Sequence, residues 1–88
     1  MANHKSSLKR IRQSERRRKR NQHIRSGMRS EVKSFRQALE AGDATLAGER
    51  FATAERTIRR AASKGVIPRQ RADRKVSRLA KALNGLGS

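Results

Sequence analysis

Cysteine, tryptophan and tyrosine are absent from this chain of 88 residues. The absence of cysteine excludes a disulfide framework and any thiolate metal site. No apolar run approaches the roughly 20 residues that a membrane span requires. The N-terminus also lacks the apolar stretch of a secretory signal, so we expect a cytoplasmic protein.

Acidic residues are also scarce, with 7 Asp and Glu against 24 Lys and Arg, which gives a net charge of +17. Such a chain repels itself, and we expect its fold to be marginal without a counter-charge. A pI near 12 is typical of nucleic-acid-binding proteins. The excess is steepest in residues 1–36, which hold 13 basic and 2 acidic residues. The composition therefore predicts a nucleic-acid partner.

The most basic segment runs from Lys9 to Arg29. It contains no large apolar residue between Ile11 and Ile24, no proline, and only one glycine, Gly27. Nothing in it breaks a helix, yet a helix charged on every side cannot bury a face against its own protein. We expect a polyanion outside the chain to accept it.

An apolar stripe begins within this segment and continues beyond it. Its members are Ile24, Met28, Val32, Phe35 and Leu39. Their spacing of three and four residues predicts one buried face on a helix. Ser6 or Ser7 could cap the start of this helix, and Gly42 suits a left-handed cap at its end. We expect a first helix over residues 7–41 whose core face lies in its C-terminal half.

Two further stripes predict two more helices. The first of these stripes consists of Ala47, Phe51, Ala54, Ile58 and Ala61 or Ala62. The second consists of Ala72, Val76, Leu79 and Leu83. Asp43 is a good N-cap for the second helix, and Gly65 followed by Val66 suits a Schellman cap at its end. Pro68 is pre-organised for the first turn of the third helix.

The short connections between the helices require neighbouring helices to run antiparallel. We therefore predict an all-α fold, an antiparallel three-helix bundle with a long, basic N-terminal helix projecting beyond it. Residues 1–88 form a single domain, in which residues 1–23 are a basic extension and residues 24–88 are the bundle. No period-two alternation indicates a strand.

No arrangement of residues suggests catalysis. The two histidines, His4 and His23, lack metal-ligand spacing, and no glycine-rich phosphate loop is present. The acids are scattered, and Glu15–Lys19 and Glu55–Arg59 have the spacing of intrahelical ion pairs. We expect no enzyme activity, cofactor, metal or small-molecule substrate.

Basic residues are the candidate binding residues. Arg16, Arg17, Arg18 and Arg20 lie in a run without acids and cover several sides of the predicted helix, which suits insertion between phosphate backbones. A second basic group consists of Arg69, Arg71, Arg74, Lys75 and Arg78 on the third helix, with Lys64 just before it. Arg71, Arg74, Lys75 and Arg78 have the spacing of a face opposite the apolar stripe, and a face that is merely exposed to solvent is the competing interpretation.

The missing aromatic residues narrow the type of nucleic acid. Stacking on single-stranded bases uses exposed aromatic rings, whereas both phenylalanines lie on predicted core stripes. Phosphate contacts should dominate, with residues such as Asn3, Ser6 and Asn21 able to hydrogen-bond phosphate, ribose or base edges. This indicates recognition of a folded shape rather than of a linear sequence.

The chain resembles a family of bacterial ribosomal proteins, the twentieth protein of the small subunit. The resemblance is carried by the opening MANHKSSLKR, by Gln13-Ser14-Glu15, Arg20-Asn21, Arg25-Ser26, the turn Glu40 to Asp43, Lys64-Gly65, Ala72, Arg74 and Ser77-Arg78-Leu79. It covers essentially the whole chain. Pro68, Asp73 and Val76 depart from the family pattern.

The resemblance implies a three-helix bundle embedded in small-subunit ribosomal RNA, among other components of that subunit. The RNA contacts that it implies are Asn3, Lys5, Ser6, Lys9, Arg10, Ser14, Arg20, Asn21, Arg25, Ser26, Arg29, Lys64, Arg69, Arg71, Arg74 and Arg78. Contacts at the three departing positions are not implied. Asp73 would repel phosphate, so we expect it to face the protein or solvent.

Three hypotheses follow for the partner. The first is a structural, non-catalytic binder of ribosomal RNA in the cytoplasm. The second is a nucleoid or chromatin-like DNA-packaging protein, which the composition also allows. The third, a helix lying on a membrane surface, is disfavoured because Lys9 to His23 lacks an apolar face, so we expect no membrane partner.

Overall fold

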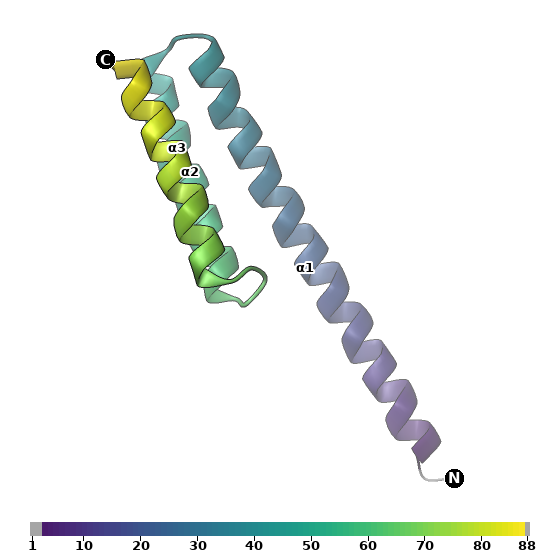
Figure 1. Ribbon diagram of the computed structural model, residues 1–88. Coiled ribbons are helices and arrows are strands. Elements are labelled where there is room, and N and C mark those ends of the chain that lie inside the picture. Colours follow the sequence, from purple (N-terminus) through teal and green to yellow (C-terminus); the bar gives the residue numbers. More distant parts are fainter. Residues whose placement is uncertain (1–2, 88) are drawn as a thin grey trace.

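The computed structural model describes residues 3–87, which form three helices and no strand (Figure 1). The helices are α1 (Asn3–Glu40), α2 (Ala44–Ser63) and α3 (Arg69–Gly87). Each helix runs antiparallel to the next, so the predicted all-α antiparallel bundle with a long first helix is confirmed.

The first helix begins earlier than predicted. α1 contains 38 residues, about 57 Å at 1.5 Å per residue. Ser6 and Ser7 lie inside it rather than at its N-cap, so that part of the prediction was wrong. The physical reason is that residues 3–7 contain no proline or glycine, and the helix can continue through them.

Both connections use glycine in the left-handed region. Gly42 has φ 72° and Gly65 has φ 77°, which only glycine adopts without steric cost. The amide of Val66 donates to the carbonyl of Ala61 at 2.9 Å, and that of Gly65 donates to Ala62 at 3.0 Å. This pair of bonds is the predicted Schellman cap.

The start of α2 follows the predicted chemistry, whereas Pro68 lies just before α3 rather than in its first turn as predicted. Asp43 caps α2, because its Oδ1 accepts a hydrogen bond from the amide of Leu46 at 3.0 Å. Pro68 lies just before α3, and its carbonyl accepts the first helical bond, from Ala72 at 3.1 Å. The short connections that result explain the antiparallel course of the chain.

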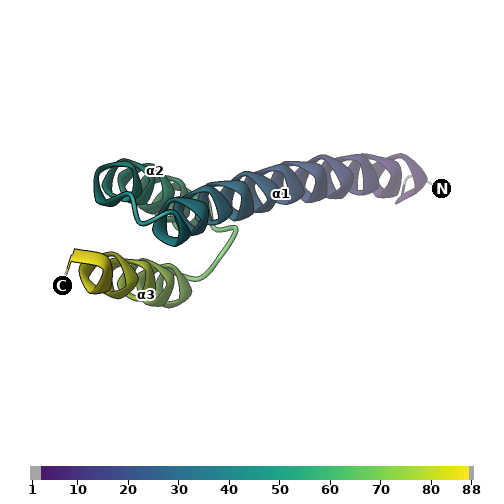
Figure 2. The ribbon, with the colours of Figure 1, turned by 90° about the horizontal axis from the view of Figure 1, so that it is seen from above.

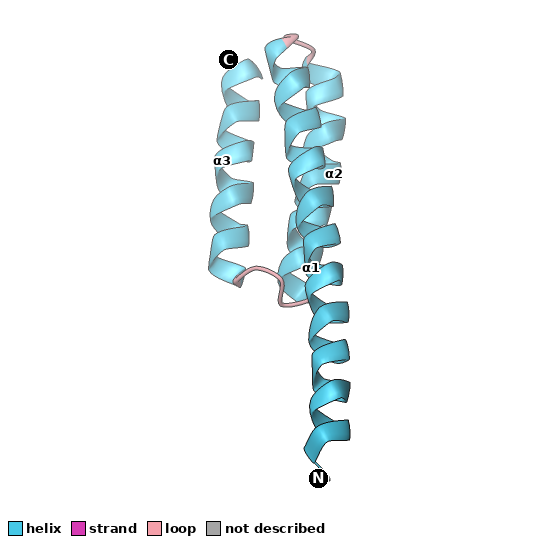
Figure 3. Cartoon of the chain, turned by 90° about the vertical axis from the view of Figure 1, so that its right-hand side faces the viewer, coloured by secondary structure: helices cyan, strands magenta, loops and turns pink. Residues whose placement is uncertain are grey.

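The three helices do not pack equally. α2 packs along both α1 and α3, whereas α1 and α3 barely touch one another. Figure 2 shows the bundle from above, with α1 and α3 both beside α2, and Figure 3 shows α3 standing apart from α1. The bundle is therefore open along the α1–α3 side, which the three stripes alone did not predict.

The core is small and rich in alanine. Its buried members are Met28, Phe35, Ala38, Ala47, Ala54, Ile58, Ala61, Val66, Ile67, Ala72, Val76 and Leu79. Phe35 and Ile58 are fully buried, and the ring of Phe35 meets that of half-buried Phe51 with centroids 5.9 Å apart. Three alanines on α2 let that helix approach both neighbours closely.

The N-terminal half of α1 has no part in this core. Met28 is the first buried residue of the helix, and half-buried Ile24 is the first that packs against the core. The molecule extends 67 Å along its longest axis and only 22 and 13 Å along the others. We call residues 5–23 of α1 the shaft; it projects past the end of the bundle (Figure 1).

We predict that Phe35→Ala lowers the free energy of unfolding by about 3–5 kcal/mol, since it removes a fully buried ring from a core too small to refill the space. Urea unfolding followed by circular dichroism at 222 nm measures this change. Gln37→Ala, at an exposed position of the same helix, is the control and should shift stability by less than about 0.5 kcal/mol. Equal effects would contradict the assignment of Phe35 to the core.

We also predict that amides of the shaft exchange with solvent much faster than those of residues 28–40 in the free protein. The shaft is held only by its own backbone bonds, and local opening there exposes no buried apolar surface. Hydrogen exchange read by mass spectrometry on peptides from the two halves of α1 tests this. Comparable protection of the two halves would show that the shaft is held by more than its own helix.

Candidate nucleic-acid interface

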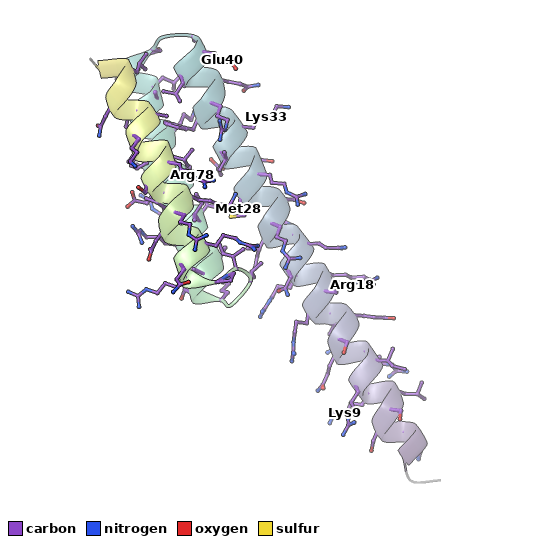
Figure 4. The ribbon with its side chains drawn as sticks, in the orientation of Figure 1. Lys9, Arg18, Met28, Lys33, Glu40 and Arg78 are labelled. Atoms are coloured by element: carbon purple, nitrogen blue, oxygen red, sulfur yellow. The ribbon has the colours of Figure 1, made fainter. Side chains whose placement is uncertain are left out.

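The shaft presents basic side chains on all of its sides. Figure 4 shows side chains projecting all round it, with Lys9 and Arg18 far from α2 and α3. All but one of the predicted contacts on it are exposed, namely Lys5, Ser6, Lys9, Arg10, Ser14, Arg16, Arg17, Arg18 and Arg20. The side chain of Asn3, also a predicted contact, lies outside the described residues.

Asn21 differs from the other predicted contacts, because it is half-buried. Its Oδ1 is shielded from solvent and has no hydrogen-bond partner among the described residues. Buried side-chain acceptors are usually satisfied. A donor from outside the chain would complete this site, so the position of Asn21 is compatible with its predicted role.

Arg25, Ser26 and Arg29 lie where the shaft meets the bundle, and all three are exposed. Arg25 also donates a hydrogen bond from Nη2 to the carbonyl of Val66 at 3.5 Å. This bond links α1 to the connection between α2 and α3. Arg25 therefore has a structural contact that the sequence did not predict, in addition to an exposed charge.

The second basic group lies at and beyond the α2–α3 connection. Lys64, Arg69, Arg71, Arg74 and Arg78 are all exposed. Arg71, Arg74 and Arg78 lie opposite the buried stripe of α3, as the helical spacing predicted. Lys64 and Arg69 flank the connection that Arg25 contacts, so they stand near the base of the shaft. Arg78 lies further along α3 (Figure 4).

The positions that depart from the family pattern have structural explanations. Val76 is buried in the core. Asp73 Oδ1 accepts a hydrogen bond from Arg59 Nη1 at 3.4 Å, and Arg59 also pairs with Glu55 at 3.6 Å. Asp73 thus faces α2, as predicted, and joins the two helices. Pro68 is exposed beside the start of α3.

Nearly all of the positive charge lacks an acidic partner. Among the described side chains, the only ion pairs are the two that Arg59 makes. The predicted Glu55–Arg59 pair is confirmed, whereas the Glu15–Lys19 pair is not formed and that prediction was wrong. No carboxylate of the described chain therefore neutralises the shaft.

A group of basic residues that the sequence analysis did not bring together borders the open side of the bundle. Lys75, which was predicted to lie opposite the apolar stripe of α3, is half-buried and belongs to this group, so its predicted placement was wrong. A groove of about 270 Å³ lies between α1 and α3 over Met28 and Val32. Lys33 and Arg36 from α1 and Lys75 from α3 line it together with Arg29. The sequence signal was the three- and four-residue spacing of Arg29, Lys33 and Arg36, but only the fold shows that Lys75 faces them.

No other kind of site is apparent in the part of the chain that the structure describes. Within it, no group of three or more metal-ligating side chains is close enough to hold an ion. None of its helices combines the length and the hydropathy that crossing a bilayer would require. The exposed basic surface is therefore the candidate site.

Comparison with known proteins identifies the family of the chain. Residues 2–84 match the family model described as ribosomal protein S20. Small ribosomal subunit protein bS20 of Geotalea uraniireducens is 54% identical over 87 residues, covering 99% of this chain and 100% of that protein. The bS20 protein of Geotalea daltonii is 55% identical over 86 residues, covering 98% of this chain and 99% of that protein. The bS20 protein of Nocardia farcinica is 52% identical over 86 residues, covering 98% of this chain and 100% of that protein. The chain belongs to the ribosomal protein S20 family.

Proposed function

We propose that this protein of the small ribosomal subunit binds the subunit's RNA directly and stabilises the packing of its helices by neutralising phosphates. The observation that carries the proposal is the shaft, a helix with cations on every side, no core face and no acidic partner. Charges held in this way favour a site where several phosphate backbones come close together.

The bundle gives the shaft its fixed position. In this proposal residues 24–88 are the bundle domain, and residues 1–23 are the extension that enters the RNA. Because α1 is continuous from one part to the other, the direction of the shaft is set by the packing of its C-terminal half. RNA segments that contact the shaft are then held in a defined place relative to the bundle.

The residues proposed to contact RNA fall into three groups. On the shaft and just before it they are Asn3, Lys5, Ser6, Lys9, Arg10, Ser14, Arg16, Arg17, Arg18, Arg20 and Asn21. At its base they are Arg25, Ser26, Arg29, Lys64 and Arg69, and on α3 they are Arg71, Arg74 and Arg78. The shaft carries most of the affinity, because its charge is the densest.

Folded RNA is favoured over single strands, since the described surface offers no exposed aromatic ring for base stacking. The protein acts without catalysis, cofactor or small-molecule substrate, on the cytoplasmic ribosome and beside other components of the small subunit. A DNA-packaging role is the second candidate, because an excess of positive charge by itself does not distinguish RNA from DNA.

We predict that affinity for folded small-subunit RNA falls steeply with salt, and that Arg17→Gln with Arg18→Gln weakens it. Each lost phosphate contact should lower the log–log slope by about 0.7–0.9. The double variant should thus reduce the slope by roughly 1.4–1.8. Filter binding or fluorescence anisotropy over a series of salt concentrations measures this.

Arg50→Gln with Arg56→Gln is the matched control, because both residues are exposed on α2 and make no ion pair. This double variant removes two positive charges from the bundle, as many as the shaft variant loses. It should change the salt slope of RNA affinity less than the shaft variant does. Arg59 is unsuitable as a control, since it pairs with Asp73 and Glu55. Equal slopes for the two double variants would show that the shaft has no special role.

The two candidate functions are separated by competition. We expect folded small-subunit RNA to displace the protein from duplex DNA at equal phosphate concentration, because the shaft suits closely packed backbones rather than a single rod of DNA. A preference for duplex DNA in this assay would favour the packaging role.

A further inference from the structure

Two apolar side chains stand out on the shaft. Leu8 is 44% exposed and Ile11 is 52% exposed, and these are the only large apolar side chains among the described residues that are exposed to this degree. Every other one belongs to the core or packs against it. Leu8 and Ile11 are three residues apart on α1, so they lie side by side on one face of the helix.

This apolar pair is not an extension of the core stripe. Ile11 and Ile24 are 13 residues apart, which separates them by about 20 Å along the helix and by about 140° around it. The pair therefore points away from the side on which α1 meets the bundle. No described segment of the chain covers it while α1 is a continuous helix.

Cations surround the pair. Leu8 borders a shallow hollow that is also lined by Lys5, Lys9, Arg12 and Arg16. Ile11 borders a second hollow, lined by Arg10 and Arg18 together with Ser14 and Glu15. The two hollows hold six basic residues and one acid, so whatever covers the pair meets a strongly positive rim.

We propose that Leu8 and Ile11 contact riboses and base edges in the shallow groove of an RNA helix, while the surrounding cations bind the phosphates on either side. The proposal rests on the proposed function and adds to it a contact that is not electrostatic. The shallow groove of A-form RNA is wide and displays sugars and base edges between two phosphate backbones. Apolar side chains placed in a nucleic-acid minor groove contact such a floor directly.

Other occupants match this surface less well. A second copy of the chain would bring two molecules of charge +17 together, and their repulsion opposes that contact. An acidic protein surface would satisfy the cationic rim, but the continuous run of basic residues along the shaft favours a partner that is a polyanion along its length. RNA is the occupant whose negative charge matches both the cationic rim around the pair and the basic residues along the shaft.

The contact should contribute affinity that salt does not remove. Neutralising a phosphate changes the slope of affinity against salt, whereas burying an apolar side chain shifts affinity by about the same factor at every salt concentration. Loss of both contacts should weaken binding roughly tenfold or more, given the free energy of burying several methylene groups.

A matched pair of full-length variants tests the proposal. Leu8→Gln with Ile11→Gln makes the pair polar, and Leu8→Met with Ile11→Met keeps it apolar at a similar size. Glutamine and methionine have similar helix propensities, so helicity, checked by circular dichroism, should match in the two variants. We expect the Gln variant to bind folded small-subunit RNA roughly tenfold more weakly with an unchanged salt slope, and the Met variant to bind as the unaltered protein does.

Hydroxyl-radical cleavage, which attacks riboses of paired and unpaired nucleotides alike, provides a second measurement. The unaltered protein and the Met variant should protect a set of riboses that the Gln variant leaves reactive at saturating protein. Equal RNA affinity and equal ribose protection for both variants would overturn the proposal. The Gln variant could instead keep its RNA affinity but enter reconstituted small subunits less well. That result would overturn the proposal and favour a protein as the occupant of this surface. Absence of RNA binding by the unaltered protein would instead refute the proposed function, and this contact with it.

Discussion

The position of the shaft depends on the packing of the C-terminal half of α1 against α2. Phe35 and Ile58 are fully buried there, and Phe51 covers Phe35 from the side. Among the described residues of α1, no apolar side chain before Ile24 packs against the core. A small core at one end thus determines where a long charged helix points, in the way that a fixed end determines the direction of a rod.

Charge imposes the opposite constraint. A net charge of +17 opposes compaction, and the described side chains form ion pairs only around Arg59. Of these two pairs, the one with Asp73 joins α2 to α3, and the one with Glu55 lies within α2. The remaining cations are free to bind a partner, and a bound polyanion would remove the repulsion that they exert on one another. The proposed binding of RNA would therefore affect stability through the same residues.

The pattern of apolar residues predicted the helices, their caps and their antiparallel order, because each of these depends on neighbours in the sequence. Asp43 and Gly65 act as their residue types indicated. The N-terminal end of α1 was misplaced, since a serine can cap a helix or lie within one, and local chemistry does not choose between them. The exposed contacts of the shaft were predictable, because a segment without apolar residues has no core face to hide its charges.

Sequence alone determined that the chain is helical and that its first helix is too charged to be buried along its N-terminal half, and it predicted a polyanionic partner. These properties follow from periodicity and composition, which need no knowledge of distant contacts. Only the tertiary structure decided that α3 stands apart from α1 with Lys75 facing Arg29 and that Arg25 contacts the carbonyl of Val66. Such contacts join residues far apart in the chain, and they depend on how closely the alanines of α2 let its neighbours approach.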